Sequence, residues 1–479
     1  MTHERKTTLA LLGLLGGGLV LRLPGLGGDL WMDEVFALVR FMRPPLLQIL
    51  TTFTSDNQHL LYSAAAHLAL YLPIGEAVAI RLPALGLGVA SLWALVRLAT
   101  PLAGRGAATW AAALMAASYH HAWFSQNARG YTGLLLATLL ATDAYLRLER
   151  GESGANAWIY AAALALGAGM HLLMGFVGLA HLLAAGAAAA MGRLTGSRLR
   201  HFAAAFAGGG LLTILVYAAA FGEAVAFFTN PTARAYGAAE GWTRPLWLLR
   251  EAISGLASGF GAGLVLGLGA VILAAAPALL GAWTLARRRP TAVVLFLLPG
   301  ALTLAALVVL DRHLWPRFFF HFLGFACLAL VCGAMELSRR TGRERLGPWL
   351  CAALVAASLT TLPRLYRLPK QDFSGARSLV EASLAPGDVV VGVGLAGETY
   401  RLYYAPHWRL ARTLEELEAA GAGAERVWAV YTLPGYLAQT RPELLAALES
   451  EYSLVGRLPG TLPGGELIVR RRDARGEAP

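Results

Sequence analysis

Long apolar runs separated by short polar segments dominate the first three quarters of the chain. The runs are rich in alanine, leucine, glycine and valine, and they lack the alternation of apolar and polar residues that is typical of a membrane β-strand. About 20 apolar residues are enough for one helix to cross a bilayer. We therefore predict an all-α polytopic membrane domain with about eleven transmembrane helices, at residues 9–26, 82–100, 107–124, 131–147, 157–171, 173–191, 202–221, 263–286, 291–310, 317–336 and 348–363.

The pattern changes in two places. Residues 27–81 mix charges and prolines with short apolar pieces, which predicts a first outer loop containing helices that lie along the membrane interface. Residues 364–479 show strand-like runs at 388–393, 426–431 and 466–470 and helical spacing at 377–382 and 414–420. We predict a membrane domain at 1–363 and a small soluble α/β domain at 364–479.

Charge gives the predicted orientation. Basic clusters fall in alternate connections, which the positive-inside rule places in the cytoplasm; they are Arg5-Lys6, Arg97 with Arg105, Arg147 with Arg150, Arg193 with Arg198 and Arg200, Arg287–Arg289, and Arg339–Arg345. We expect a protein of the inner or plasma membrane whose N-terminus is cytoplasmic and whose C-terminal domain is extracytoplasmic. The first run has no small-x-small cleavage site, so we interpret it as a retained anchor.

Composition supports these predictions. The chain has 479 residues, of which 57% are hydrophobic and only 14% charged, so lipid is its main solvent. The net charge of +11 does not indicate nucleic-acid binding, because the basic residues lie in short clusters between apolar runs. The three cysteines, Cys327, Cys332 and Cys351, fall inside apolar runs, which predicts buried thiols and no disulfide framework.

Charged groups near membrane depth are costly, and they are therefore candidates for function. On the predicted outer face these candidates, with two histidines, are Asp33, Glu34, His59, Arg81, Arg129, His171, Arg244, Asp311, Arg312 and Arg317. A carboxylate can take a proton from a hydroxyl, and guanidinium groups bind phosphate through paired hydrogen bonds. Each candidate also has an interpretation without a function. Asp33-Glu34 is typical of a solvated helix end, and Arg317 could simply pair with Asp311.

Other polar positions favour packing. The adjacent His120 and His121 could suggest a metal site, but neighbouring helix positions do not face one ion together. His181 lies in an apolar run, which is typical of a histidine packed in the protein core. Trp242 and Trp247 are typical of the aromatic belt at a membrane interface rather than of a platform that stacks on a sugar.

Several stretches, taken in order, resemble the polyprenyl-phosphate-dependent glycosyltransferases with the GT-C fold, especially the protein O-mannosyltransferases and the lipid A aminoarabinose transferases. The matching stretches are Trp31-Met32-Asp33-Glu34, Asp56-Asn57-Gln58-His59-Leu60-Leu61-Tyr62, Arg81-Leu82-Pro83, Ser125-Gln126-Asn127-Ala128-Arg129-Gly130-Tyr131 and Trp315-Pro316-Arg317-Phe318. Two departures are Leu60-Leu61, where the family has two prolines, and Phe318, where it has tyrosine.

The resemblance implies a membrane glycosyltransferase that transfers a sugar, with inversion, from a polyprenyl-phosphate donor to an extracytoplasmic acceptor hydroxyl. Asp33 would be the general base, with Glu34 in support. The implied phosphate ligands are Arg129, Arg81 and Arg317, and the implied cavity-lining residues are His59, Tyr62, His171 and Tyr131. Arginines that hold a monophosphate need no metal, so we assign no metal and no cofactor, although a divalent metal stays open.

Three functions from different classes stay open at this stage. The expected partners of a transferase are a polyprenyl-phosphate-linked sugar donor, membrane lipid, and an acceptor that is a lipid, a glycan or a protein. The alternative is a transporter or flippase for a lipid-linked or small polar solute. A transporter would be expected to show internal repeats and interrupted helices in corresponding positions, and the sequence shows neither. A catalytically silent assembly scaffold is the third reading, and the Asp33-Glu34 pair argues against it.

Overall fold

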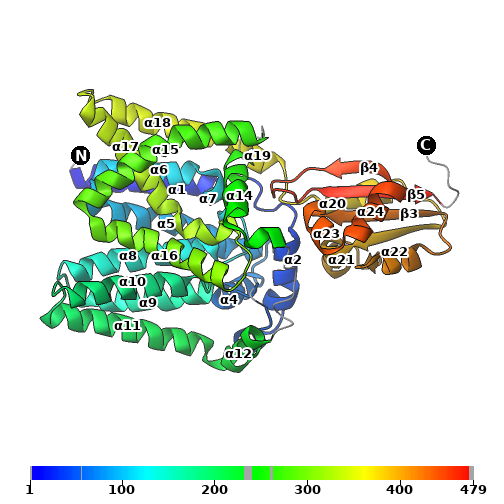
Figure 1. The fold of residues 1–479 in the computed structure, drawn as a ribbon, viewed down its shortest axis with the longest axis horizontal. Coiled ribbons are helices and arrows are strands. Elements are labelled where there is room, and N and C mark those ends of the chain that lie inside the picture. Colours follow the sequence, from blue (N-terminus) through cyan, green and yellow to red (C-terminus); the bar gives the residue numbers. More distant parts are fainter. Residues whose placement is uncertain (1–2, 56, 231–239, 259–262, 474–479) are drawn as a thin grey trace.

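The computed structural model describes residues 3–55, 57–230, 240–258 and 263–473. Figure 1 shows a bundle of long helices and, at one end of it, a smaller domain of helices and strands. Most of the long helices run along the longest axis of the molecule, and the N-terminus lies at the end of the bundle that is far from the smaller domain. The two parts meet near the predicted boundary: α19 (Leu362–Arg367) is followed by α20 (Phe373–Glu381), the first helix of the smaller domain.

Among the described residues, every predicted span coincides with one helix or with two in series. The long helices are α1 (His3–Val20), α5 (Glu76–Ala103), α6 (Arg105–Ala117), α8 (Tyr131–Glu149), α9 (Ala155–Met170), α10 (Met174–Ala190), α11 (Gly196–Tyr217), α15 (Gly263–Arg288), α16 (Pro290–Val309), α17 (Leu323–Arg340) and α18 (Leu346–Leu359). Six helical stretches in the described residues are long and apolar enough to cross a membrane: Glu76–Ala103, Gly196–Thr229, Val271–Arg288, Pro290–Val309, Pro316–Arg340 and Leu346–Arg367. A mostly helical membrane protein is confirmed, and the number eleven stays a prediction.

A break interrupts the predicted span 107–124. The run 107–124 forms α6 and then a separate short helix, α7 (Tyr119–Ser125), with Ser118 between them. The Ser118 hydroxyl accepts a hydrogen bond from the His121 N–H (3.4 Å), which satisfies one of the free donors at the start of α7. An apolar run cannot reveal such a break, because both halves are hydrophobic.

Ion pairs and a hydrogen bond join the helix ends beside connections that were predicted to be cytoplasmic. Arg97 and Arg147 both pair with Asp143, at 2.7 and 2.9 Å. The Thr291 hydroxyl, at the start of α16, donates to the Glu149 carboxylate at the end of α8 (2.9 Å). In Figure 1 the α8–α9, α15–α16 and α17–α18 connections lie at the end of the bundle away from the smaller domain. The basic clusters of these three connections therefore lie at one end of the bundle, and the orientation in the membrane stays a prediction.

Two glycines allow α15 and α17 to pack backbone against backbone. A Cβ atom on Gly281 would lie 1.8 Å from the Ala329 carbonyl oxygen, and one on Gly333 would lie 1.8 Å from that of Pro277. Small residues at such crossings are typical of membrane helices, whose association depends on close packing. The described cysteines are all free and buried, as predicted.

Shorter helices cover the end of the bundle that faces the smaller domain. They are α2 (Met32–Ala37), the π-helix η1 (Leu38–Met42), α3 (Leu46–Thr51), α4 (Leu60–Ala69), η2 (Ala218–Ala220), α12 (Phe221–Thr229), η3 (Glu240–Thr243), α14 (Pro245–Ser258) and η4 (Pro316–Phe322). In Figure 1, α2 and α14 run across the bundle axis between the two parts. Residues 27–81 thus form short helices, and their position at a membrane interface stays a prediction.

The smaller domain is a five-stranded mixed sheet with helices packed on it. Its elements after α20 are β1 (Asp388–Val393), α21 (Gly394–Thr399), the π-helix η5 (Tyr400–Tyr404), β2 (Arg409–Ala411), α22 (Leu414–Gly421), β3 (Arg426–Thr432), α23 (Pro434–Thr440), α24 (Pro442–Glu451), β4 (Ser453–Leu458) and β5 (Leu467–Asp473). The strand order is β2-β1-β3-β5-β4, with β1 parallel to β2 and β3, and β5 antiparallel to β3 and β4. The predicted strands are β1, β3 and β5; the edge strands β2 and β4 are short or mostly exposed, and they lack a clear apolar pattern.

The two parts are joined by specific contacts. The Asp29 carboxylate accepts hydrogen bonds from the backbone N–H and the hydroxyl of Ser374, both at 2.8 Å. The Tyr404 hydroxyl donates to the Leu30 carbonyl (2.8 Å). Leu30 and Asp29 immediately precede α2, so the smaller domain is attached to the segment that carries Asp33.

Candidate active site

Residues from five separate segments converge at this end of the bundle. Asp33 lies in the first turn of α2, Arg129 lies in the turn between α7 and α8, and Arg317 lies in η4. His59 immediately precedes α4, and His171 lies between α9 and α10. All five were candidates from the sequence, and the fold brings them together although they span nearly 300 residues.

Asp33 is held by two arginines. Its side chain is 12% exposed, and its Oδ2 atom accepts a hydrogen bond from Arg129 Nη1 at 3.0 Å. Arg317 Nη1 lies 3.6 Å from the same oxygen, a looser pair, and the Arg317 side chain is 27% exposed. The predicted alternative, in which Arg317 pairs with Asp311, is replaced by this contact with Asp33. One carboxylate facing two guanidinium groups leaves a net positive charge, which favours an anionic ligand.

Arg129 is fixed from two sides. Its Nε donates to His59 Nε2 at 2.8 Å, so the His59 ring accepts at this atom and is neutral. Burial lowers the pKa of His59 well below its usual value, and the charge on Arg129 lowers it further. Next in the chain, a Cβ on Gly130 would lie 1.8 Å from the Met170 carbonyl oxygen, so only glycine lets this turn rest against the end of α9.

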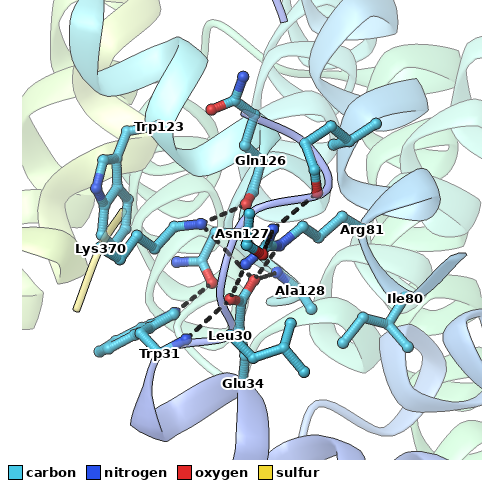
Figure 2. A network of polar contacts seen from close by, with 12 residues as sticks. Leu30, Trp31, Glu34, Ile80, Arg81, Trp123, Gln126, Asn127, Ala128 and Lys370 are labelled. Atoms are coloured by element: carbon cyan, nitrogen blue, oxygen red, sulfur yellow. Dashed lines mark hydrogen bonds and ion pairs between the residues drawn. The ribbon is translucent and has the colours of Figure 1, made fainter. Parts of the chain in front are cut away.

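Glu34 makes a different set of contacts, shown in Figure 2. Its side chain is fully buried. Oε1 accepts from Arg81 Nε (2.9 Å) and from the Ala128 N–H (2.7 Å), while Oε2 accepts from Arg81 Nη2 (2.6 Å) and more weakly from the Trp31 N–H (3.4 Å). Burial alone would raise the pKa of Glu34, but the charges of Arg81 and Lys370 and these hydrogen bonds hold it below its usual value. Glu34 therefore ties α2 to the segment that carries Arg129.

Arg81 has no donor left for a phosphate. Besides its two bonds to Glu34, its Nη1 donates to the carbonyls of Leu26 (2.7 Å) and Gly28 (2.8 Å), and its Nη2 donates to that of Asp29 (2.8 Å). A guanidinium group has five N–H donors, and all five are used here. The prediction that Arg81 binds the donor phosphate does not fit these contacts, because the guanidinium group is buried and already satisfied.

The predicted cavity-lining residues divide into two groups. His59, Tyr131 and His171 form one aromatic cluster, with ring centroids 4.7 Å apart for the two histidines and 4.8 Å for Tyr131 and His171. The Arg129 guanidinium lies 5.8 Å from the Tyr131 ring. Tyr62, in contrast, donates its hydroxyl to the Ile80 carbonyl (2.7 Å) and is fully buried, so it packs against α5.

The remaining sequence candidates pack within or beside the bundle. His121 is buried; its Nε2 lies 2.9 Å from the Ser91 hydroxyl, and its Nδ1 contacts Arg22. His181 lies in the core between Tyr145 and Tyr160. Among the described residues no group of three potential ligands is placed to hold a metal ion, and Asp56 lies outside the described residues. Trp242 and Trp247 stack on each other, with Trp315 and Tyr436 also within 6 Å of Trp242.

Sequence reasoning missed three buried polar residues. Arg22, at the end of the first apolar run, donates to the Ser125 hydroxyl (3.1 Å) and to the Ala116 carbonyl (3.1 Å). A lone arginine in an apolar run is a signal that could have identified it. Lys370 and Gln371 lie just after the bundle, in a segment without apolar periodicity, and both contact the α2 region.

Comparison with solved structures gives the class of fold. The chain has the GT-C fold, and it aligns over its whole length with ArnT from Cupriavidus metallidurans, a lipid A aminoarabinose transferase. In its apo state that protein is 13% identical in sequence, with a TM-score of 0.51 and 100% of both chains covered. The structure of the same ArnT bound to undecaprenyl phosphate is 14% identical, with the same TM-score and coverage.

A second similar fold is that of the oligosaccharyltransferase AglB from Archaeoglobus fulgidus. The AglB structure with an inhibitory peptide and a dolichol-phosphate has a TM-score of 0.56 at 10% identity, covering 100% of this chain and 75% of that one. The complex with Zn and sulfate has a TM-score of 0.57 at 12% identity, covering 96% and 75%. No protein-family model matches the sequence, and no curated protein matches it.

Proposed function

We propose that the protein is a membrane glycosyltransferase that moves a sugar from a polyprenyl-phosphate donor to an extracytoplasmic acceptor hydroxyl, with Asp33 as general base. The observation that carries the proposal is the buried Asp33 carboxylate between Arg129 and Arg317, which come from separate segments. The fold supports the same reaction class, because similar solved structures are transferases, and two of them hold undecaprenyl phosphate and dolichol-phosphate.

In this reaction the acceptor hydroxyl loses its proton to Asp33 as its oxygen attacks the anomeric carbon of the sugar. The bond between that carbon and the phosphate oxygen breaks, and its electron pair leaves with the polyprenyl phosphate. Attack from the face opposite the leaving group inverts the anomeric configuration. A base within hydrogen-bond reach of the hydroxyl and a cation beside the departing phosphate both lower the barrier.

The contacts suggest different roles for the two arginines. Arg129 is held by both His59 and Asp33, so we assign it to orienting the base while it faces the reacting groups. Arg317 makes the looser contact with Asp33 and is partly exposed to the site, so we assign it to binding the donor phosphate. We assign Glu34 and Arg81 to holding α2 in place. His171 and Tyr131 are proposed to line the site beside them.

The topology that fits this proposal places the N-terminus in the cytoplasm and the smaller domain outside. The basic connections lie at the end of the bundle away from that domain, as the positive-inside rule requires. Protease added to intact spheroplasts should therefore cut within residues 368–473 and leave the α8–α9 connection intact. Cleavage confined to the α8–α9 connection would reverse the orientation.

The central experiment measures release of polyprenyl phosphate from a panel of radiolabelled polyprenyl-phosphate sugars, with purified protein and membrane extract as the acceptor source. Wild type should transfer label from at least one donor, and Asp33→Asn should lose this activity. Asp311→Asn is the matched control, because Asp311 is exposed and its positive φ of 49° suits asparagine. Equal rates for wild type and Asp33→Asn would disprove the role of Asp33, and donor movement across vesicles without label transfer would favour the flippase.

A further inference from the structure

The segment between the bundle and the smaller domain enters the neighbourhood of Asp33. Lys370 and Gln371 lie in this segment, and both are buried. The Lys370 ammonium donates to the Gln126 carbonyl (2.5 Å), lies 3.8 Å from Glu34 Oε1, and sits 5.3 Å from the Trp123 ring centre. Figure 2 shows it reaching the Glu34 network from the side opposite to Arg81.

Gln371 forms a bridge between the two parts. Its Oε1 atom accepts a hydrogen bond from the Met32 N–H (3.1 Å), immediately before Asp33. Its Nε2 atom donates to the Thr432 hydroxyl (3.0 Å) and to the Gly465 carbonyl (3.3 Å), at the end of β3 and just before β5. One side chain thus connects the sheet of the smaller domain to the backbone beside the proposed base.

Together, the two residues hold both neighbours of Asp33. Gln371 fixes Met32 on one side, and Lys370 contacts Glu34 on the other. Glu34 also accepts from the Ala128 N–H, so a displacement of Glu34 would move the turn that carries Arg129. A misplacement of about 1 Å in such a frame can cost about 100-fold in rate.

The choice of lysine at position 370 is informative. Of the 40 basic residues in the chain, only Lys6 and Lys370 are lysines, and the rest are arginines. A lysine ammonium is compact and can lose its proton when buried, whereas a guanidinium group stays charged. Burial and, to a smaller extent, the charge of Arg81 lower the pKa of Lys370, Glu34 opposes the shift, and the net pKa is about 7. Lys370 lines a cavity of about 210 Å³, and the charged side chains of Arg367 and Asp29 line it as well.

We propose that Lys370 and Gln371 are positioning residues for Asp33, so that the smaller domain forms part of the catalytic unit and the charge on Lys370 maintains the alignment. This inference rests on the proposed function, because it assumes that Asp33 is the base. It predicts that the protein is fully active only while the Lys370 ammonium is protonated and docked against Gln126 and Glu34.

The first test compares Lys370→Met with Arg367→Met in the same transfer assay. Arg367 is an exposed cation in the same segment and has no role in the proposed machinery, so it is a matched control. We expect Lys370→Met to lower kcat by about 10- to 100-fold with donor KM within about twofold, because the phosphate site is intact. Arg367→Met should keep wild-type kcat. Lys370→Met with wild-type kcat would overturn the proposal.

The pH profile separates positioning from a merely structural role. Lys370 is charged below about pH 7 and neutral above it, so the kcat ratio of wild type to Lys370→Met should be largest near pH 6 and shrink as the pH rises through 7. A ratio that stays constant across this range would overturn the role of the charge. Because both proteins share Asp33, titration of the base cancels from the ratio.

A third test does not require Lys370→Met to fold, because it measures the chemical labelling of Lys370 itself. In a Lys6→Arg protein, Lys370 is the one remaining lysine, so labelling by an amine-reactive reagent can be read by mass spectrometry of its peptide. Docked Lys370 should label at least about 10-fold more slowly in the folded protein than in the same protein unfolded in denaturant, because the ammonium is buried in the fold. Equal labelling rates would overturn the proposal. Loss of transfer in Asp33→Asn together with a normal Lys370→Met would refute the positioning role alone, and an active Asp33→Asn would refute the proposed function.

Discussion

Replacing Arg81 with methionine should destabilise the protein more than removing any exposed arginine. The substitution leaves the Glu34 carboxylate fully buried and takes away both of its hydrogen bonds from the charged guanidinium group, at 2.6 and 2.9 Å. It also removes the donor from three carbonyls, those of Leu26, Gly28 and Asp29. Breaking a buried ion pair from one side costs about 3–5 kcal/mol, because the remaining charge has no counterion. Lys370, at 3.8 Å, offsets only part of this loss.

The assay is unfolding of the purified protein in detergent, followed by tryptophan fluorescence, with Arg43→Met as the control. Arg43 pairs with Glu76 at 3.0 Å, but its side chain is 45% exposed, and such pairs contribute about 0–1 kcal/mol. The double variant Arg81→Met/Glu34→Gln should be less destabilised than the sum of the single variants, because the uncompensated charge is gone. Equal stability of Arg81→Met and Arg43→Met would refute the role assigned to Arg81.

Three further outcomes follow from the contacts. Arg317→Met should raise donor KM about 10-fold while Arg129→Met mainly lowers kcat, and equal effects on both constants in a steady-state assay would contradict the division of roles. Gly333→Val should prevent α15 and α17 from packing and lower the unfolding temperature, whereas Gly13→Val, with nothing within 4 Å, should be tolerated. The depressed pKa of Glu34 contributes stability above its usual value of 4.5 and loses it as the pH falls further, so Glu34→Gln should show a weaker loss of stability in an acid titration.

The helical bundle was predictable because its signals are local. A long apolar run specifies a membrane helix wherever it occurs, and all the described long helices lie on predicted spans. The strands β1 and β3 were equally clear, because they are buried and rich in valine. The break at Ser118 and the exposed edge strand β4 were not predictable, since neither changes the local pattern of apolar residues.

The sequence predicts most residues of the candidate site, but it does not predict which residues each of them contacts. Asp33 and Arg129 were singled out because charges near membrane depth are costly, and they pair in the structure. The same rule selected Arg81, but a charge pattern cannot tell whether an arginine faces a ligand or a buried glutamate 47 positions away. Lys370 carried no local signal at all, because its contacts depend on how the two parts dock.

The docking of the smaller domain has a consequence for how the protein is made. Synthesis proceeds from the N-terminus, so Glu34 and Arg81 are made long before Lys370, Gln371 and Thr461, whose hydroxyl accepts a hydrogen bond from the Trp123 indole N–H (3.1 Å). Until that last quarter of the chain folds, Met32 and Trp123 lack the side chains that bond to them in the finished molecule. A partly synthesised or truncated chain would therefore contain Asp33, Arg129 and Arg317 and still have an unfinished site. Activity would begin only when the final strands are in place.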